Sequence, residues 1–358
     1  MIILYINYVD SDRLNSGSSL RPYKMLQAFL ASGHEIITLM GNQMSRVRKQ
    51  KVREISCRID SEKPDLCYIE SPTRPIYRHC DRALIRKIHR MEVPIGYFYR
   101  DFFQMFRDEF PRRRNSIANY LKDLIVDILL PFTNRCLKNN CNIIYFPSDE
   151  CKELFRFEDM RGLPPAGEKR LMTARNYSHT CIYVGGVGGY YDINTLLNVF
   201  NVLYGYDASY KLILVCRKTE WDNFQNPLKK APWLEVHHLS GSDLIPLYRQ
   251  ASVGLVVPNL HYRYNRYAIS VKAYEYMSYG LPIVTFNHTA IGEMVIKDQV
   301  GIAADHSIAS FIESIKTILS NKDMYFQYVD KVEKSLLEKN LWKHRVAQII
   351  EELSMCSS

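Results

Sequence analysis

Short apolar runs alternate with longer amphipathic stretches along the whole chain. The short runs resemble strands that are covered on both faces of a parallel sheet. Strands that alternate with helices predict an α/β fold with parallel sheets. The expected strands form two series, which are Ile2–Asn7, Glu35–Met40, Leu66–Glu70, Pro94–Tyr99 and Asn142–Phe146, and then Cys181–Gly185, Lys211–Cys216, Leu234–Leu239, Val253–Pro258, Leu281–Phe286 and Gly301–Ala304.

Helical periodicity fills the stretches between these runs. The segment Pro22–Ser32 places its apolar residues on one side, and Gly33 stands just beyond its end. Proline is favoured in a first turn, so we expect this helix to begin at about Pro22. Further helices are expected over Asp81–Met91, Ser116–Lys138, Asp192–Leu203, Ala268–Tyr279 and Trp342–Ser354.

The two strand series are separated by a weakly periodic stretch, Phe157–Tyr177, which is rich in Gly and Pro. We interpret it as a linker between two doubly wound domains. A chain of 358 residues also suits two domains. The expected boundaries are residues 1–160 for the first domain, 161–178 for the linker and 179–341 for the second domain.

Composition narrows the possible partners. The net charge is +9, and basic clusters occur at Arg46–Arg53 and Arg112–Arg114. Such a balance suits phosphate-bearing small molecules, an anionic membrane or nucleic acid. No nucleic-acid-binding signature accompanies the charge, so we do not expect nucleic acid as a partner.

The sequence has no run of apolar residues long enough to span a bilayer, and Met1–Asn7 resembles a strand and not a signal peptide. The nine scattered cysteines suggest reduced thiols, so we expect a cytoplasmic protein. The helix Ser116–Lys138 is apolar with basic flanks. It fits either a buried core helix or an amphipathic helix that lies on the inner face of the plasma membrane.

The most informative motif is Ser270–Thr285, a helix that ends at Gly280 and is followed by a short buried strand. It resembles the donor-site motif K-x-x-E-Y-M-x-x-G-x-P-[IV]-[IV] of retaining glycosyltransferase family 4. The matching residues are Lys272, Glu275, Tyr276, Met277, Gly280, Pro282, Ile283 and Val284.

This resemblance implies a GT-B fold, in which two Rossmann-like doubly wound parallel-sheet domains face each other across a cleft. It implies that the acceptor binds on the first domain and that the second binds the nucleotide-sugar donor. It also implies that Glu275 hydrogen-bonds the ribose hydroxyls of the donor, and that a C-terminal helix at about 342–355 packs back on the first domain. Ser270 and Lys272 belong to the same expected site.

Ligands of parallel α/β sheets bind at the carboxyl ends of the strands, so polar residues there are candidates for catalysis. Arg100 and Asp101 follow one strand and suit a sugar or phosphate, although a structural ion pair is an equal alternative. Arg217 and Lys218 follow another strand, where cations stabilise a departing diphosphate. Arg266, in the loop before the motif helix, is a further candidate, with simple solvation as its alternative.

Two glycines lie in the expected first βα loops. Gly17 precedes the first helix and fits either a ligand loop or a plain capping turn. Gly186 lies in a Gly-rich turn that does not have the dinucleotide-binding spacing, because Tyr191 stands where the third Gly is needed. The sequence also departs from the pattern of this family at two places. The family often places an Arg and a Lys in this turn, and Tyr267 stands where it commonly has a sugar-facing Glu.

The resemblance implies transfer of a sugar from a nucleotide diphosphate, with UDP as the expected nucleotide, to a cell-envelope or capsular glycan, which is free or lipid-linked. Retention of configuration is implied, and neither a cofactor nor a metal is expected. One alternative is a sugar-nucleotide epimerase of the same fold, with Asp101 or His288 as acid or base. Another is a non-catalytic subunit that binds a partner enzyme. The sugar, the acceptor, the linkage and the oligomeric state are not encoded in recognisable motifs.

Overall fold

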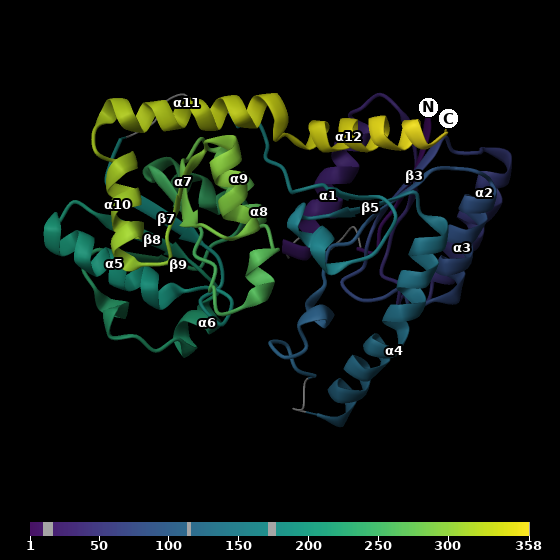
Figure 1. Cartoon of the computed structure of the whole chain (residues 1–358), viewed down its shortest axis with the longest axis horizontal. Helices are drawn as coiled ribbons and strands as arrows, with labels where there is room; N and C mark the ends of the chain where they lie inside the picture. The colour runs from purple at the N-terminus through teal and green to yellow at the C-terminus, as the bar shows by residue number, and fades with distance from the viewer. Residues whose placement is uncertain (10–16, 113–115, 171–176, 358) are drawn as a thin grey trace. The chain divides into compact units, whose positions relative to one another are not determined.

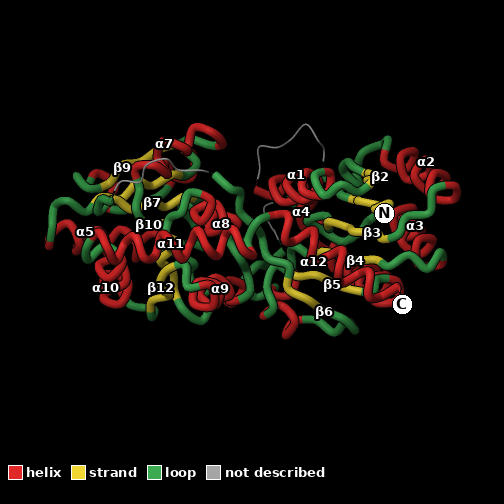
Figure 2. Tube along the Cα trace, turned by 90° about the horizontal axis from the view of Figure 1, so that it is seen from above, coloured by secondary structure: helices red, strands yellow, loops and turns green. Residues whose placement is uncertain are grey.

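The computed structural model describes residues 1–9, 17–112, 116–170 and 177–357, and it divides into two compact units (Figure 1). The first unit comprises Met1–Pro164 and Trp342–Ser358, and the second comprises Pro165–Leu341. Each unit contains a six-stranded sheet in which all neighbouring strands are parallel. Helices flank the strands on both sides in each unit (Figure 2). The α/β class predicted from the apolar pattern is therefore confirmed.

The first sheet has the strand order β2-β1-β3-β4-β5-β6. Five strands lie where the apolar runs predicted them. The edge strand β6 was not predicted, because it is a three-residue strand within the Gly- and Pro-rich stretch and pairs with β5 through Met160 and Ile144. The strands are β1 Ile2–Ile6, β2 Glu35–Leu39, β3 Leu66–Glu70, β4 Ile95–Phe98, β5 Ile143–Phe146 and β6 Met160–Gly162.

Helices α1 and α12 cover one face of this sheet, and α2, α3 and α4 cover the other (Figure 1). The prediction that Pro22 lies in the first turn was wrong, because α1 begins five residues earlier. The helix α2 was not predicted, since its sequence is strongly basic and only Arg48, Val52 and Ile59 are buried. The helices are α1 Gly17–Leu30, α2 Arg48–Ser61, α3 His79–Arg90, α4 Ile117–Asn140 and α12 Trp342–Ser354, with short 3-10 turns η1 Phe103–Phe106, η2 Glu150–Leu154 and η6 Met355–Ser357.

The close packing of α12 on the first sheet depends on a glycine. A Cβ atom at Gly96 would lie 2.8 Å from Tyr145 Cε2 and 3.1 Å from Leu353 Cδ1. The space that a side chain would fill is therefore taken by the Tyr145 ring and by the fully buried Leu353 of α12. Neighbouring rings of Tyr5 and Tyr68 extend this aromatic layer, with centroids 6.1 Å apart.

The second sheet has the strand order β12-β11-β10-β7-β8-β9. All six strands overlap the predicted apolar runs, and half of the twelve strand ends differ by one to three residues, chiefly because the last residues of several runs belong to the loops that follow. The strands are β7 Thr180–Val184, β8 Lys211–Val215, β9 Leu234–His237, β10 Val253–Leu255, β11 Ile283–Phe286 and β12 Gly301–Ala304.

Two apolar clusters hold the helices of the second unit to opposite faces of its sheet. One cluster contains residues of α5 and α10, and the other contains residues of α7, α8 and α9. The helices are α5 Ile193–Tyr206, α6 Lys218–Asn223, α7 Ile245–Gln250, α8 Val271–Ser278, α9 Ala290–Asp298, α10 Ile308–Ile318 and α11 Lys322–Lys339, with 3-10 turns η3 Pro227–Lys230, η4 Gly241–Leu244 and η5 Arg263–Arg266.

In each sheet, strands are added along the chain first toward one edge and then toward the other, so the order changes direction at one point between two neighbouring strands. In the first unit the reversal lies between β1 and β3, and in the second it lies between β7 and β10. The helices that follow the two strands at such a point leave on opposite faces of the sheet, which opens a crevice at the carboxyl ends. These two crevices are the places where the fold favours ligand binding. Among the described residues, no helix has both the length and the apolar character needed to cross a bilayer.

Candidate functional site

The crevice of the second unit is framed by the loops that follow β7 and β10. Asn265 is buried and donates from Nδ2 to the carbonyl of Tyr190 at 2.8 Å and to that of Asn259 at 2.9 Å. Asn259 in turn donates to the carbonyl of Gly189 at 2.9 Å. Amide side chains therefore hold the two loops in a fixed arrangement around the crevice.

Helix α8 is anchored to the crevice by Tyr276. The Tyr276 hydroxyl accepts the backbone N–H of Val184 at 2.9 Å and donates to the carbonyl of Leu255 at 3.2 Å. These two groups lie at the ends of β7 and β10. The ring lies directly against Gly254, where an added Cβ would be 2.5 Å from ring atoms. The sequence motif is thus positioned by a tyrosine that joins the two strands of the crevice.

Glu275 and Lys272 lie one turn apart on α8. Lys272 Nζ is 2.7 Å from Glu275 Oε2, and the Glu275 side chain is 21% exposed. Ser270 caps the helix by accepting the backbone N–H of Lys272 at 3.2 Å. The carboxylate can accept hydrogen bonds from two neighbouring hydroxyls, and the ammonium can bind an anionic group.

The Gly-rich loop after β7 is supported by an acid that the sequence did not single out. Glu220 Oε2 accepts the backbone N–H of Val187 at 3.2 Å. A Cβ atom at Gly186 would lie 3.1 Å from the same Oε2 and 3.0 Å from Tyr191 Cε2, so glycine allows this close approach. Nothing in the local sequence links Glu220 to this loop, because the two are brought together by the neighbouring strands β7 and β8.

Arg217 and Lys218, which were predicted to face a diphosphate, are paired with acids of α6. Arg217 Nη1 is 2.7 Å from Glu220 Oε1, and Lys218 Nζ is 3.0 Å from Asp222 Oδ2. Both cations are exposed, so ion pairs of this kind are weak and exchangeable. Arg217 therefore connects to the Gly-rich loop through Glu220.

The loop before α8 carries Arg266 and Tyr267. The Arg266 guanidinium is exposed and lies 5.8 Å from the centre of the Tyr267 ring. Tyr267 itself is buried, with 8% of its surface exposed. The position where the resembling family commonly has an acid is thus occupied by a buried aromatic ring. His288 lies after β11, is exposed and has a φ of 56°.

A polar pocket of about 420 Å³ lies beside the loops of the same unit. It is lined by the N-terminal residues of α5 and α10 and by the loop after β10. His306 Nε2 is 3.9 Å from Asp192 Oδ2, the N-cap residue of α5, and His261 also faces the pocket. Sequence reasoning did not predict this pocket, because its residues come from three separate loops.

In the first unit, Arg100 and Asp101 follow β4 and contact each other. Arg100 Nε is 3.3 Å from Asp101 Oδ2, and both side chains are largely buried. Arg100 also donates to Thr73 Oγ1 at 3.0 Å, and its backbone N–H donates to Ser71 Oγ at 3.1 Å. The pair is thus built into the loop after β3, and the ion-pair alternative describes the geometry seen in this conformation.

Asp101 also lines a cavity of about 10 Å³, together with Ser71, Tyr97, Tyr99 and Thr133. Burial raises the pKa of Asp101 above its usual value, and Arg100 opposes that rise. A carboxyl with a raised pKa beside a cavity is typical of groups that accept or hold a proton. The role of Asp101 in binding an acceptor stays a prediction, because its carboxylate is paired with Arg100 in this conformation.

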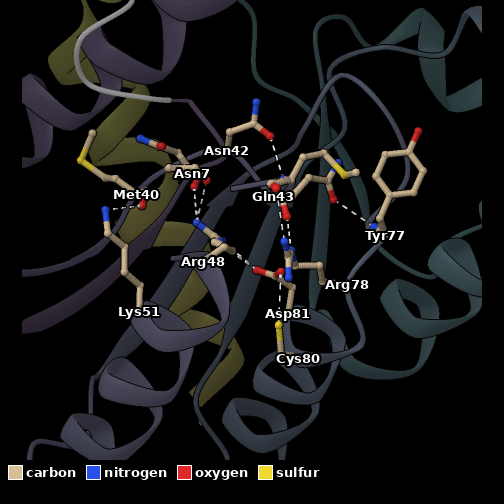
Figure 3. A network of polar contacts seen from close by, with 12 residues as sticks. Asn7, Met40, Asn42, Gln43, Arg48, Lys51, Tyr77, Arg78, Cys80 and Asp81 are labelled. Carbon is tan, nitrogen blue, oxygen red and sulfur yellow. Dashed lines mark hydrogen bonds and ion pairs between the residues drawn. The ribbon is translucent and has the colours of Figure 1, made fainter. Parts of the chain in front are cut away.

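A network of polar contacts in the first unit surrounds Arg48, which is fully buried (Figure 3). Its Nη1 donates to the carbonyls of Asn7 and Gly41, each at 3.0 Å. Its Nη2 is 2.8 Å from Asp81 Oδ1, which α3 contributes. The guanidinium also lies 4.4 Å from the centre of the Tyr8 ring. Arg48 therefore ties the ends of β1 and β2 to α3.

Arg48 was predicted to have no individual role, because it belongs to the basic cluster Arg46–Arg53, and a run of basic residues is most often a solvated or ligand-binding surface. Gly17, the glycine that was predicted as a site residue in this unit, is the first residue of α1. Within the described ranges, no group of three or more His, Cys, Asp or Glu side chains is arranged to hold a metal ion.

Comparison with known proteins connects the second unit to a family. Residues 178–321 match the family model described as "Glycosyl transferases group 1". The matched segment contains the Gly-rich loop, Glu220 and the whole of α8. No curated protein matches the chain by sequence.

Solved structures share the fold of the whole chain. The lipopolysaccharide-biosynthesis glycosyltransferase WaaG is 11% identical, with a TM-score of 0.61, and covers 97% of this chain and 98% of its own. A glycosyltransferase from Rickettsia africae is 11% identical, with a TM-score of 0.67 and coverage of 99% and 98%. An alpha-glucosyltransferase in complex with UDP and DNA is 12% identical, with a TM-score of 0.63 and coverage of 98% and 99%. The predicted GT-B fold class is confirmed.

We predict that Arg48→Met destabilises the first unit by about 3–5 kcal/mol, because it leaves the buried Asp81 carboxylate without its partner. Urea unfolding measured by circular dichroism gives the free energy of unfolding. The neighbouring Arg46 is exposed, so Arg46→Met serves as the control and should change that free energy by less than about 0.5 kcal/mol. Equal effects of the two substitutions would contradict the role given to Arg48.

A second prediction concerns pH and Asp101. Since the folded protein raises the pKa of this carboxyl, ionising it costs stability. The stability of the wild type should therefore fall as pH rises from about 3.9, the ordinary value for Asp, through the raised value. Asp101→Asn removes this loss, so its advantage in melting temperature should grow over that range and persist at neutral pH. Asp108→Asn, at an exposed position, is the control, and parallel pH profiles for wild type and Asp101→Asn would refute the prediction.

Proposed function

We propose that the chain is a retaining glycosyltransferase, of the family 4 type, that moves a sugar from a nucleotide diphosphate donor to a glycan acceptor. The proposal is supported by the match of residues 178–321 to group 1 glycosyltransferases and by the GT-B fold shared with three solved glycosyltransferases. UDP is the proposed nucleotide, since one of these structures holds UDP. The proposal requires no metal and no cofactor.

The observation that carries the proposal is the position of Glu275. Tyr276 anchors α8 to the ends of β7 and β10, so the adjacent Glu275 is held at the crevice where the fold favours a nucleotide. A carboxylate can accept both hydroxyls of a ribose at once. Lys272, which pairs with Glu275 in this conformation, supplies a cation for the diphosphate.

Positioning and charge stabilisation supply the proposed chemistry. The sugar–phosphate bond breaks while the acceptor oxygen bonds to the same face of the anomeric carbon. The departing phosphate oxygen takes the acceptor proton, so no enzyme carboxylate acts as a nucleophile. Cations and free backbone N–H groups around the Gly-rich loop and α8 would stabilise the charge that grows on the diphosphate. Lys272 and Arg266 are the proposed cations, and Arg217 joins them once it leaves Glu220.

The first unit is proposed to receive the acceptor, which is a cell-envelope or capsular glycan. Asp101, with its raised pKa, and Arg100 would hydrogen-bond the acceptor sugar beside the cavity. Two solved structures of similar fold are described as lipopolysaccharide glycosyltransferases, WaaG and WaaB, which supports an acceptor of this class.

The surface of α4 supports an acceptor held at a membrane. Its exposed apolar residues follow helical spacing along one side, and they are Ile117, Leu121, Ile125, Ile128 and Phe132. The exposed basic residues Lys122, Arg135 and Lys138 lie on the same helix. An apolar stripe with basic neighbours suits the interface of an anionic bilayer. We therefore propose peripheral binding to the inner face of the plasma membrane of the cell, with α4 as the contact.

The basic cluster Arg112–Arg114 was expected to contribute to membrane binding, and the structure shows how its first residue is paired. Arg112 Nε lies 2.7 Å from Asp127 Oδ2, and Arg107 also binds that carboxylate, so Arg112 is held at the protein surface by an acid that it shares with a second arginine. Arg113 and Arg114 lie outside the described residues. The membrane proposal therefore rests on the apolar stripe of α4 more than on the Arg112–Arg114 cluster.

A non-catalytic, glycosyltransferase-like subunit is the second candidate. It is favoured by the buried Tyr267 at the position of the expected acid and by the pairing of Arg217 and Lys218 with acids of α6. Measured release of UDP from UDP-sugars, with and without a glycan acceptor, distinguishes the two. A protein that binds UDP and releases none from any donor would be the subunit.

We predict that Glu275→Gln weakens UDP binding by about 10- to 150-fold, the effect of losing hydrogen bonds to a charged group worth roughly 1.5–3 kcal/mol. Isothermal titration calorimetry gives the affinity, and the melting temperature should stay unchanged. Glu293→Gln, an exposed acid in the first turn of α9, is the matched control and should bind UDP normally. Wild-type affinity in the Glu275 variant would exclude the ribose contact.

For the membrane, we predict that the protein sediments with vesicles containing phosphatidylglycerol. Replacing Leu121 and Ile125 together by Asp should abolish this sedimentation, because two charges then oppose insertion of the α4 stripe. The matched control makes the same replacement by Asp at Val202 and Tyr206, which are an exposed pair of the same spacing on α5. It should leave vesicle binding unchanged. Equal binding by the two double variants would show that α4 is not the contact.

A further inference from the structure

Tyr248 lies behind the motif helix and belongs to α7. It is fully buried. Its ring stacks on Tyr279 with centroids 4.4 Å apart and an interplanar angle of 21°, and it meets the edge of Tyr276 at 6.0 Å. Tyr279, the C-cap residue of α8, stands four residues after Glu275, so it lies about one turn beyond Glu275 on the same side. Tyr248 is therefore packed against the surface of α8 that carries Glu275.

The Tyr248 hydroxyl has no hydrogen-bond partner among the described residues. The hydroxyl of Tyr276, on the neighbouring ring, is by contrast fully used by Val184 and Leu255. An unpaired buried hydroxyl costs about 1–3 kcal/mol, and a phenylalanine would keep the ring contacts without that cost. Packing alone therefore does not explain the hydroxyl at this position.

The hydroxyl lies close to the Glu275 carboxylate. Burial raises the pKa of the Tyr248 phenol well above its usual value, and the negative charge of Glu275 is the next largest cause of the rise. The carboxylate receives Lys272 at Oε2, and its lone pairs leave room for further donors. The Tyr248 hydroxyl is a donor that α7 contributes and that has no other hydrogen-bond partner among the described residues.

We propose that Tyr248 is a positioning residue, whose hydroxyl donates a hydrogen bond to the Glu275 carboxylate when the ribose of a nucleotide engages that carboxylate. The inference deepens the proposed function and rests on the ribose contact of Glu275. Lys272 holds the carboxylate from α8, and Tyr248 holds it from α7. Contacts from two elements fix the plane of the carboxylate, so both of its oxygens are aligned with the two ribose hydroxyls before binding.

The test compares Tyr248→Phe with the wild type in UDP titrations by calorimetry. We expect affinity for UDP to fall about 10-fold, as for the loss of one hydrogen bond to a charged group. The melting temperature should stay the same or rise, because the unpaired hydroxyl is removed. Tyr276→Phe is the contrasting control, and it should lower the melting temperature because it leaves Val184 N–H and Leu255 C=O unpaired.

A double-mutant cycle with Glu275→Gln separates positioning from a general effect on the fold. If Tyr248 acts through Glu275, adding Tyr248→Phe to Glu275→Gln should cause much less than the 10-fold loss seen alone. Additive losses, or wild-type UDP affinity in Tyr248→Phe, would overturn the inference while leaving the ribose contact intact. Wild-type affinity in Glu275→Gln would overturn the ribose contact and the inference with it.

Discussion

The hydroxyl of Tyr276 is the interaction on which the candidate donor site depends. It fills the gap between the ends of β7 and β10 by accepting one backbone group and donating to another. Gly254 makes room for the ring, and Tyr248 packs against its edge. Since Glu275 is the neighbouring residue, its position follows from this anchor. The motif helix therefore has a structural role through Tyr276 in addition to the ligand-binding role proposed for Glu275.

The first unit uses a buried arginine for the same purpose. Arg48 gathers the ends of β1 and β2 and holds them to Asp81 of α3. Buried ion pairs of this kind add little stability compared with apolar packing, but removing one partner is costly. The pair of Arg48 and Asp81 holds the carboxyl ends of the strands in place, and these ends are where ligands of parallel α/β sheets bind. Both units thus place a buried polar group at the crevice that the strand order opens.

The proposed site combines a fixed part with an adjustable part. Glu275 is adjacent to the buried anchor Tyr276, whereas Arg217 and Lys218 are exposed and held by acids of α6 in weak pairs. A diphosphate would compete with those acids for the cations. Occupation of the site would then coincide with a change of ion-pair partners, and Glu220 would keep supporting the Gly-rich loop in either state.

The sequence by itself determined the α/β class, eleven of the twelve strands and the motif helix, because burial on both faces and helical periodicity are local signals. The predicted ranges did not include α2, whose buried face includes a charged residue, or β6, which has three residues, and they also did not include α7, α9, α10 and α11. Only the tertiary structure decided which charges are paired. Two contacts between separate elements illustrate this, namely Arg48 with Asp81 and Glu220 with the Gly-rich loop. The residues of each contact are far apart in the sequence, so sequence spacing cannot predict that they meet in the folded protein.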